Sequence, residues 1–164
     1  MDYLLGYGSL LSKHSREHYS RIYSPVKAVR LSGWSRSWCA AYPDENATYA
    51  GAQPKPEAQL EAILLPTTID QDLQMRERNY QFIELKPEDL SPVEDAELPL
   101  NATDRVLICA TASPTKASNQ MPLPQSYVDT CMLGCLEISG IDGMRRFVQQ
   151  TQGWDGVWFD DRHL

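Results

Sequence analysis

Two stretches of the chain carry residues that can do chemistry, and the first is Gly6-Tyr7-Gly8-Ser9-Leu10. It follows an apolar run, Tyr3 to Leu5, that predicts a buried strand ending at a glycine turn. Because glycine allows backbone angles that side chains forbid, such a turn can direct successive N–H groups at one guest. The turn suits a carboxylate or an oxyanion, and the same residues also fit a strand that simply stops at a glycine.

Residue types exclude two nucleotide-binding motifs at this turn. The dinucleotide fingerprint needs a third glycine where this chain has Leu11. A phosphate-binding loop needs Gly-Lys-Ser/Thr after its first glycine, and the sequence has no such run. We therefore do not expect the turn to bind a nucleotide.

The second stretch surrounds Glu77, in a helix predicted over residues 68–79 with Thr68 and Gln71 as a capping box. At about 100° per residue, Glu77 shares the core-facing stripe of this helix with Ile69, Leu73 and Tyr80. A carboxylate on such a stripe is costly unless it is paired or protonated. Two interpretations stay open. Glu77 pairs with a buried arginine or is drawn outward by Arg76, or it is a general acid/base whose pKa burial raises.

Other reactive side chains give weaker signals. His14 and His18 have the spacing of metal ligands, but no carboxylate or cysteine cluster completes a set, so no metal is predicted. Nucleophilic catalysis by Cys109 or Ser9 is a rival mechanism in which neither residue has an obvious base partner in the sequence. The four cysteines are expected to be reduced and mostly buried.

Three segments lie in one order along the chain: Gly6 to Leu10, Leu73 to Tyr80, and Pro124-Gln125-Ser126-Tyr127. Together they resemble the γ-glutamylcyclotransferase-like family, over most of the chain's length. The resemblance implies that Glu77 is the catalytic residue and that Tyr127 closes the pocket. The remaining substrate-binding positions that it implies are Tyr7, Gly8, Ser9 and Leu10.

The resemblance also implies a reaction: cyclisation of a γ-glutamyl group to 5-oxoproline with release of its amine partner. One carboxylate can act first as base and then as acid, and turn N–H groups can hold the oxyanion, so no cofactor or metal is required. The alternative is a non-catalytic small-molecule-binding or interaction domain on the same fold. The presence of Glu77 favours the enzyme.

The sequence departs from the family pattern at two positions, which affects the substrate prediction. Many members have Asp where this chain has Gln74, and Asn where it has Leu10. The Gly-Tyr-Gly-Ser-Leu form is closer to the branch that degrades glutathione, but the rest of that branch's signature is not evident. The leaving amine and the oligomeric state stay open.

Strand and helix patterns follow each other without regular alternation, which predicts an α+β fold in a single domain over residues 1–164. The resemblance narrows this to a small mixed-sheet barrel flanked by helices.

Further predictions are a short helix within residues 12–22, a long strand over 26–42 bent at Gly33, and strands over 48–52 and 58–65 separated by a proline loop. Later in the chain we expect strands over 81–85 and 105–111, loops over 86–103 and 112–125, and helices from about 126 to 153 broken near Gly140. The aromatic tail after Gly153 is expected to pack across the domain.

Composition excludes several partners. The 164 residues carry a net charge of −7, which argues against a nucleic-acid or anionic-membrane surface. No apolar run is long enough for a membrane span. Met1 is followed almost at once by the first predicted strand, so we expect no targeting segment and a cytoplasmic protein. The expected partner is a small-molecule γ-glutamyl substrate.

Overall fold

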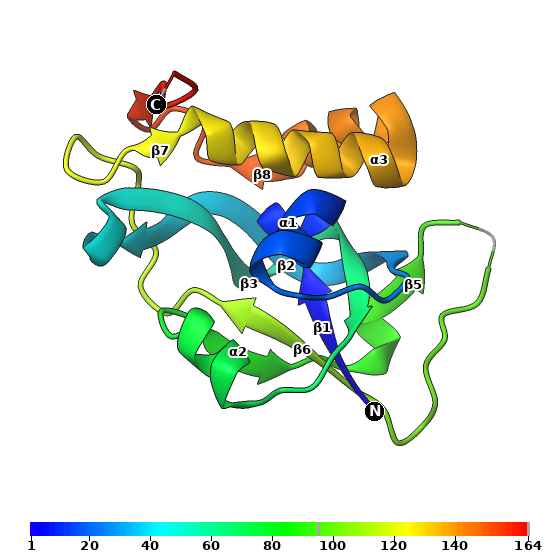
Figure 1. The fold of residues 1–164 in the computed structure, drawn as a ribbon. Coiled ribbons are helices and arrows are strands. Elements are labelled where there is room, and N and C mark those ends of the chain that lie inside the picture. The colour runs from blue at the N-terminus through cyan, green and yellow to red at the C-terminus, as the bar shows by residue number, and fades with distance from the viewer. Residues whose placement is uncertain (95, 164) are drawn as a thin grey trace.

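The computed structural model describes residues 1–94 and 96–163, and its largest feature is a long hairpin (Figure 1). Strand β2 (Lys27–Tyr42) pairs antiparallel with β3 (Ala47–Pro66). A 3-10 turn, η2 (Pro43–Glu45), joins the two strands, and Asn46 closes it in the left-handed conformation, with φ 50°. The register shifts between Ser32 and Trp34, which confirms the predicted bend at Gly33.

The hairpin belongs to a mixed sheet in the order β4-β6-β1-β3-β2-β5, with β8 beside β2. Its other strands are β1 (Asp2–Gly6), β4 (Gln81–Glu84), β5 (Leu90–Pro92), β6 (Arg105–Ala110) and β8 (Thr151–Gln152). Strand β1 pairs parallel with β6 and antiparallel with β3, so the turn after β1 emerges from the middle of the sheet. The sheet curls strongly (Figure 1), and the α+β prediction is confirmed.

Helices flank this sheet. The short α1 (Lys13–Tyr19) follows the turn after β1, and its N-cap Ser12 accepts a hydrogen bond from the Ser15 N–H. The long α3 (Gln125–Gln149) lies across one side of the sheet (Figure 1). It is broken at Gly140, whose φ of 66° and ψ of −162° are not helical, as the sequence predicted. Helix α2 (Gln71–Arg76) precedes β4 in the chain (Figure 1).

The predicted loop at Pro54 and Pro56 is wrong, because β3 runs through both prolines. Trp34 pairs with Pro54 and Ser32 with Gln59, so residues 55–58 form a wide bulge opposite Gly33. Pro56 lies in this bulge, where backbone N–H groups need no partner in the ladder, and Pro54 lies at its edge, opposite Trp34. Both predicted loops also contain short elements: η3 (Pro87–Asp89) with β5 in the first, and β7 (Leu123–Pro124) in the second.

The core is formed around the curled sheet. Apolar side chains of the central strands, such as Leu4, Ile63 and Ile108, are fully buried, and Trp38 packs against Phe147 of α3. After α3 the chain forms β9 (Trp158–Phe159), which pairs with β7 beside the start of the helix. Within the described residues, no helix is both long and apolar enough to cross a membrane.

Candidate active site

The turn after β1 is built as the sequence predicted. Strand β1 ends at Gly6, and a 3-10 turn, η1 (Ser9–Leu11), follows. The Leu11 N–H donates to the Gly8 carbonyl over 3.0 Å, and the Ser12 N–H donates to the Ser9 carbonyl over 3.0 Å. The Gly8 N–H has no acceptor among the hydrogen bonds of the described residues, so it is available to a guest.

Gly8 is needed for close approach rather than for an unusual φ. A Cβ atom at Gly8 would lie 2.6 Å from the Tyr127 Oη atom and 3.2 Å from the Ala50 Cβ atom. The Ala50 N–H donates to the same Tyr127 hydroxyl over 3.3 Å. The turn therefore touches both α3, through Tyr127, and β3, through Ala50.

A cavity opens at this contact, and all the predicted site residues line it. The empty space amounts to about 360 Å³. Its walls are formed by Leu5, Tyr7, Gly8, Ser9, Leu10, Ala50, Glu77, Tyr80, Cys109 and Tyr127. The cavity adjoins a wider hollow of about 1230 Å³, open to solvent, with which it shares Ser9, Leu10, Glu77, Tyr80 and Tyr127. Segments distant in sequence thus meet at one concave site.

Glu77 reaches the cavity by a different local structure from the one predicted. A helix is present within the predicted range 68–79, but the predicted bounds and the Thr68–Gln71 capping box are wrong. Asp70 is the N-cap, its carboxylate accepts from the Leu73 N–H over 2.9 Å, and α2 ends at Arg76. Glu77 is the C-cap with φ −100° and ψ 26°, and the Tyr80 N–H donates to its carbonyl over 2.9 Å. The helix is shorter because a side-chain cap at Asp70 starts it later and this turn ends it earlier.

The Glu77 carboxylate is half-buried and unpaired. No cation lies within ion-pair distance of it, and no donor hydrogen-bonds it, anywhere in the described ranges 1–94 and 96–163. Burial raises the pKa of Glu77 above its ordinary value, and the neighbouring Arg76 guanidinium opposes this only in part. Arg76 itself donates to the Tyr19 carbonyl over 3.0 Å. The interpretation of Glu77 as an ion-pair partner of a buried arginine therefore has no support.

Three tyrosine hydroxyls surround the cavity: those of Tyr7 and Tyr127, which were predicted from the sequence as site residues, and that of Tyr80, which was not. Tyr7 donates to the Cys109 carbonyl, and Tyr80 donates to the Ala50 carbonyl over 2.7 Å. Burial raises the pKa of Tyr7, Tyr80 and Tyr127, so all three phenols stay neutral around Glu77. The sequence placed Tyr80 on the core-facing stripe beside Glu77, where nothing distinguished it from an ordinary core tyrosine.

A buried arginine holds the far end of the turn. Arg16, on α1, donates from Nη1 to the Leu10 carbonyl over 2.9 Å and to the Leu11 carbonyl over 2.8 Å. Arginine supplies several donors in a fixed plane, so one side chain can satisfy adjacent carbonyls. The turn is therefore held in place independently of any guest.

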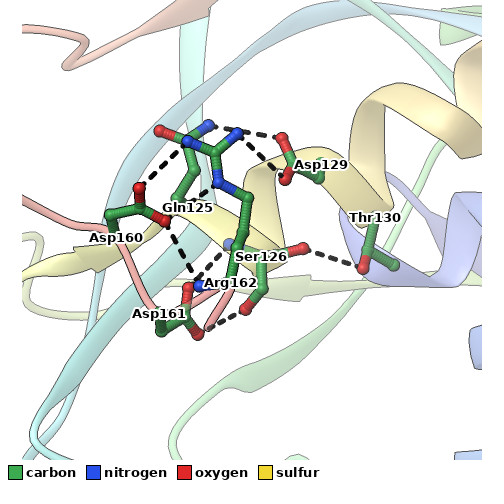
Figure 2. Close-up of polar contacts among 7 residues, drawn as sticks. All are labelled: Gln125, Ser126, Asp129, Thr130, Asp160, Asp161 and Arg162. Carbon is green, nitrogen blue, oxygen red and sulfur yellow. Dashed lines mark hydrogen bonds and ion pairs between the residues drawn. The ribbon is translucent and has the colours of Figure 1, made fainter. Parts of the chain in front are cut away.

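The C-terminal segment meets the start of α3 through polar contacts (Figure 2), and its Asp161 lines the outer hollow. The N-cap of α3 is Pro124, which cannot cap with its side chain. The Asp161 carboxylate caps the helix instead, accepting from the Ser126 N–H over 2.8 Å and from the Ser126 hydroxyl. Burial raises the pKa of Asp161, but these hydrogen bonds lower it by more, so the carboxylate stays ionised.

The other reactive side chains do not assemble a second centre. In the part of the chain that the structure describes, no three His, Cys, Asp or Glu side chains gather as metal ligands. The rings of His14 and His18 stack 4.0 Å apart on α1. All four cysteines are free and buried. Cys109 lines the cavity, but burial raises the pKa of its thiol far above neutrality, so a Cys109 thiolate nucleophile is disfavoured.

Comparison with solved structures finds this fold in proteins of low sequence identity. A structure described as γ-glutamyl cyclotransferase matches with a TM-score of 0.64 at 12% identity, over 97% of this chain and 94% of that chain. The human protein loc79017 matches with a TM-score of 0.63 at 12% identity, over 97% and 94%. YkqA from Bacillus subtilis matches with a TM-score of 0.60 at 15% identity, over 96% of this chain and 55% of that chain. No family model and no curated protein sequence matches the chain. The resemblance suggested by the sequence is thus confirmed at the level of the fold: the chain has the γ-glutamyl cyclotransferase fold.

Proposed function

We propose that the protein is a γ-glutamylcyclotransferase that converts a small γ-glutamyl compound to 5-oxoproline and a free amine. One observation carries the proposal: the unpaired carboxylate of Glu77 and the turn from Gly8 to Leu10 line the same cavity. A carboxylate with a raised pKa and a set of backbone donors are the groups that an intramolecular aminolysis needs. The γ-glutamyl head occupies the inner cavity, and the leaving amine extends into the outer hollow.

In the first half of the reaction, Glu77 accepts a proton from the α-ammonium group of the substrate. The freed amine attacks the γ-carbonyl carbon of the same molecule and closes a five-membered ring. Because nucleophile and electrophile belong to one substrate, correct positioning supplies much of the rate. The negative charge that develops on the γ-carbonyl oxygen is held by N–H groups of the turn, of which the Gly8 N–H has no acceptor in the described residues.

In the second half, protonated Glu77 returns its proton to the leaving nitrogen, and the bond between that nitrogen and the γ-carbon breaks. After the attack the ring nitrogen still carries two protons, and it releases one of them to solvent. The products are 5-oxoproline and the amine, and Glu77 is again ionised. A raised pKa suits both halves, because a group that titrates nearer neutrality exchanges a proton more readily in either direction. No metal or redox step is required. The burial of all four thiols fits a reducing, cytoplasmic setting.

The decisive experiment compares the parent protein with Glu77→Gln. We expect 5-oxoproline release from a panel of γ-glutamyl compounds, including glutathione, γ-glutamyl amino acids and γ-glutamylamines. The Gln variant should lose about 10²–10⁴-fold in turnover, the usual worth of a positioned proton transfer, while it still binds substrate. Glu57→Gln, an exposed glutamate in the bulge of β3, is the matched control and should be unaffected.

The alternative is a domain that binds γ-glutamyl compounds without turning them over. It predicts substrate binding to the parent protein with no release of 5-oxoproline from any member of the panel. A folded Glu77→Gln protein with the parental rate would remove Glu77 from the mechanism. Calorimetric measurement of substrate binding and an assay of 5-oxoproline release, made on one preparation, distinguish the enzyme from the binding domain.

A further inference from the structure

Arg36, on β2, is a buried arginine that the proposed mechanism leaves unused. Its side chain is fully buried, with 0% of its surface exposed. The guanidinium lies 3.9 Å from the centre of the Phe147 ring, and its Nε atom donates to the Thr151 hydroxyl over 2.8 Å. Its position is therefore fixed from the side of α3 and the chain that follows it.

This arginine has no carboxylate partner within ion-pair distance in the described residues. The backbone carbonyl of Glu61 accepts from Arg36 Nη1 over 3.0 Å, but the Glu61 carboxylate lies 2.6 Å from Arg146 Nε and 3.5 Å from Arg30 Nη2. Burial lowers the pKa of Arg36 to about 10, so it remains charged at neutral pH. An isolated buried charge is costly, which makes an unbalanced arginine in a core unusual.

Arg36 contacts the turn directly. Its Nη1 atom donates to the Tyr7 carbonyl over 3.2 Å. The peptide bond between Tyr7 and Gly8 is trans, so the Gly8 N–H points in the opposite direction from that carbonyl. A cation on the carbonyl side of a peptide also polarises it and makes its N–H a stronger donor.

We propose that Arg36 is a positioning residue for the anion held at the turn, acting through the Tyr7–Gly8 peptide. The arginine orients this peptide so that the Gly8 N–H faces the Glu77 cavity, and its unbalanced positive charge stands behind the developing oxyanion. The inference rests on the proposed cyclotransferase reaction. Arg16 hydrogen-bonds the other end of the turn. Of these two arginines, Arg36 is the one that hydrogen-bonds the Tyr7–Gly8 peptide, whose N–H has no acceptor in the described residues.

The test replaces Arg36 with Met, which keeps most of the apolar stem and removes the charge and the donors. We expect kcat to fall about 10²–10³-fold, the usual loss for one oxyanion donor, with a smaller change in KM. Affinity for 5-oxoproline, which carries a carboxylate, should fall in parallel. Arg30→Met is the matched control, because Arg30 lies on the same strand, meets Glu61 and does not touch the turn. It should keep the parental kcat.

A purely structural role for Arg36 predicts a different pattern. Arg36→Met would then lower the melting temperature while the folded fraction keeps the parental kcat and affinity, and this result would overturn the inference. If the Met variant does not fold, Arg36→Lys decides, because it keeps the charge but loses the planar fork. We expect the Lys variant to retain an intermediate kcat, and a folded Lys variant with the parental kcat and KM would also overturn it.

Chemical rescue distinguishes an effect of the Arg36 guanidinium group from an effect of the packing of its side chain. Arg36 borders a small cavity also lined by Ser139, Cys135 and Phe147 of α3, and its buried Nη2 atom has no hydrogen-bond partner in the described residues. Guanidinium ion at millimolar concentration should restore part of the kcat of Arg36→Ala, whereas an equal concentration of sodium chloride should not. Equal effects of the two salts would count against the inference. A parent protein that releases no 5-oxoproline would instead reject the proposed function itself.

Discussion

Glu77 is the residue on which the proposed chemistry depends, and its surroundings set its behaviour with pH. Burial raises its pKa, with Arg76 as a weaker opposing influence. The tyrosines that share the cavity are neutral, so they can solvate the carboxylate only as dipoles. A carboxyl group held this way is ionised less readily than one in water, and it is poised to exchange a proton.

This leads to a prediction about the pH dependence of stability. Because the folded pKa of Glu77 is raised, its contribution to stability is complete below the ordinary glutamate pKa and is lost as the pH rises through the folded pKa. Glu77→Gln should therefore raise the melting temperature relative to the parent near pH 7 and not near pH 4. Thermal melts of both proteins across that range check the prediction. A difference that grows toward acid would contradict the raised pKa.

The same group should control the rate. We expect kcat/KM of the parent to rise with pH through the raised pKa of Glu77, as one carboxyl group ionises to its basic form. Rate measurements between about pH 4 and pH 8 test this, with substrate charge checked by a parallel titration. The absence of an acidic limb would show that another group accepts the proton.

At the scale of elements, the shape of the turn after β1 is fixed by close contacts with α3 and β3. Gly8 is the position of closest approach, since a Cβ atom there would overlap the Tyr127 hydroxyl. Arg16 and Arg36 hydrogen-bond the backbone carbonyls at the two ends of the turn. The turn is thus a preformed element whose shape does not depend on the substrate.

We therefore predict that Gly8→Ala destabilises the fold by about 1–3 kcal/mol, the typical cost of overpacking, and lowers kcat/KM. Tyr127→Phe removes the hydroxyl that the new methyl group meets, so the double variant should be less unstable than the sum of the single changes. Urea unfolding of the four proteins measures this coupling. Additive effects would show that the Gly8 and Tyr127 atoms do not meet.

At the scale of the whole molecule, the C-terminal segment is joined to the start of α3, the helix that carries Tyr127. Asp161 caps α3 at Ser126, next to Tyr127, and lines the outer hollow (Figure 2). Arg162 lies among Asp160 and Asp129, with its Nε donating to Asp160 over 2.9 Å. The end of the chain thereby fixes the start of the helix that carries Tyr127.

Asp161→Ala should remove this cap and cost about 1 kcal/mol, the typical worth of an N-cap. Since the folded pKa of Asp161 is lowered, its contribution is present above the ordinary aspartate pKa and is lost as the pH falls through the folded pKa. Urea unfolding should show that Asp161→Ala lowers the free energy of unfolding less near pH 3 than near pH 7. Asp155→Ala, which removes an exposed pair with Lys116, is the control and should change little.

The sequence alone determined the features that depend on local pattern. The strand before Gly6, the bend at Gly33 and the break at Gly140 were predictable, because each reflects a backbone preference or a period that nearby residues express. The glycine turn and Glu77 were identified as candidates in the same way, with the family resemblance joining them to Tyr127. These positions required no knowledge of what lies across the fold.

Only the tertiary structure decided what depends on contacts between distant segments. Pro56 of β3 is accommodated by the bulge opposite Gly33, and α2 is short because Asp70 caps its N-terminus and its C-cap, Glu77, has non-helical angles. Tyr80 joins the cavity wall and Arg36 reaches the turn across the sheet, although neither has a distinguishing sequence context. Burial and long-range hydrogen bonds, which a linear pattern does not encode, gave these residues their surroundings.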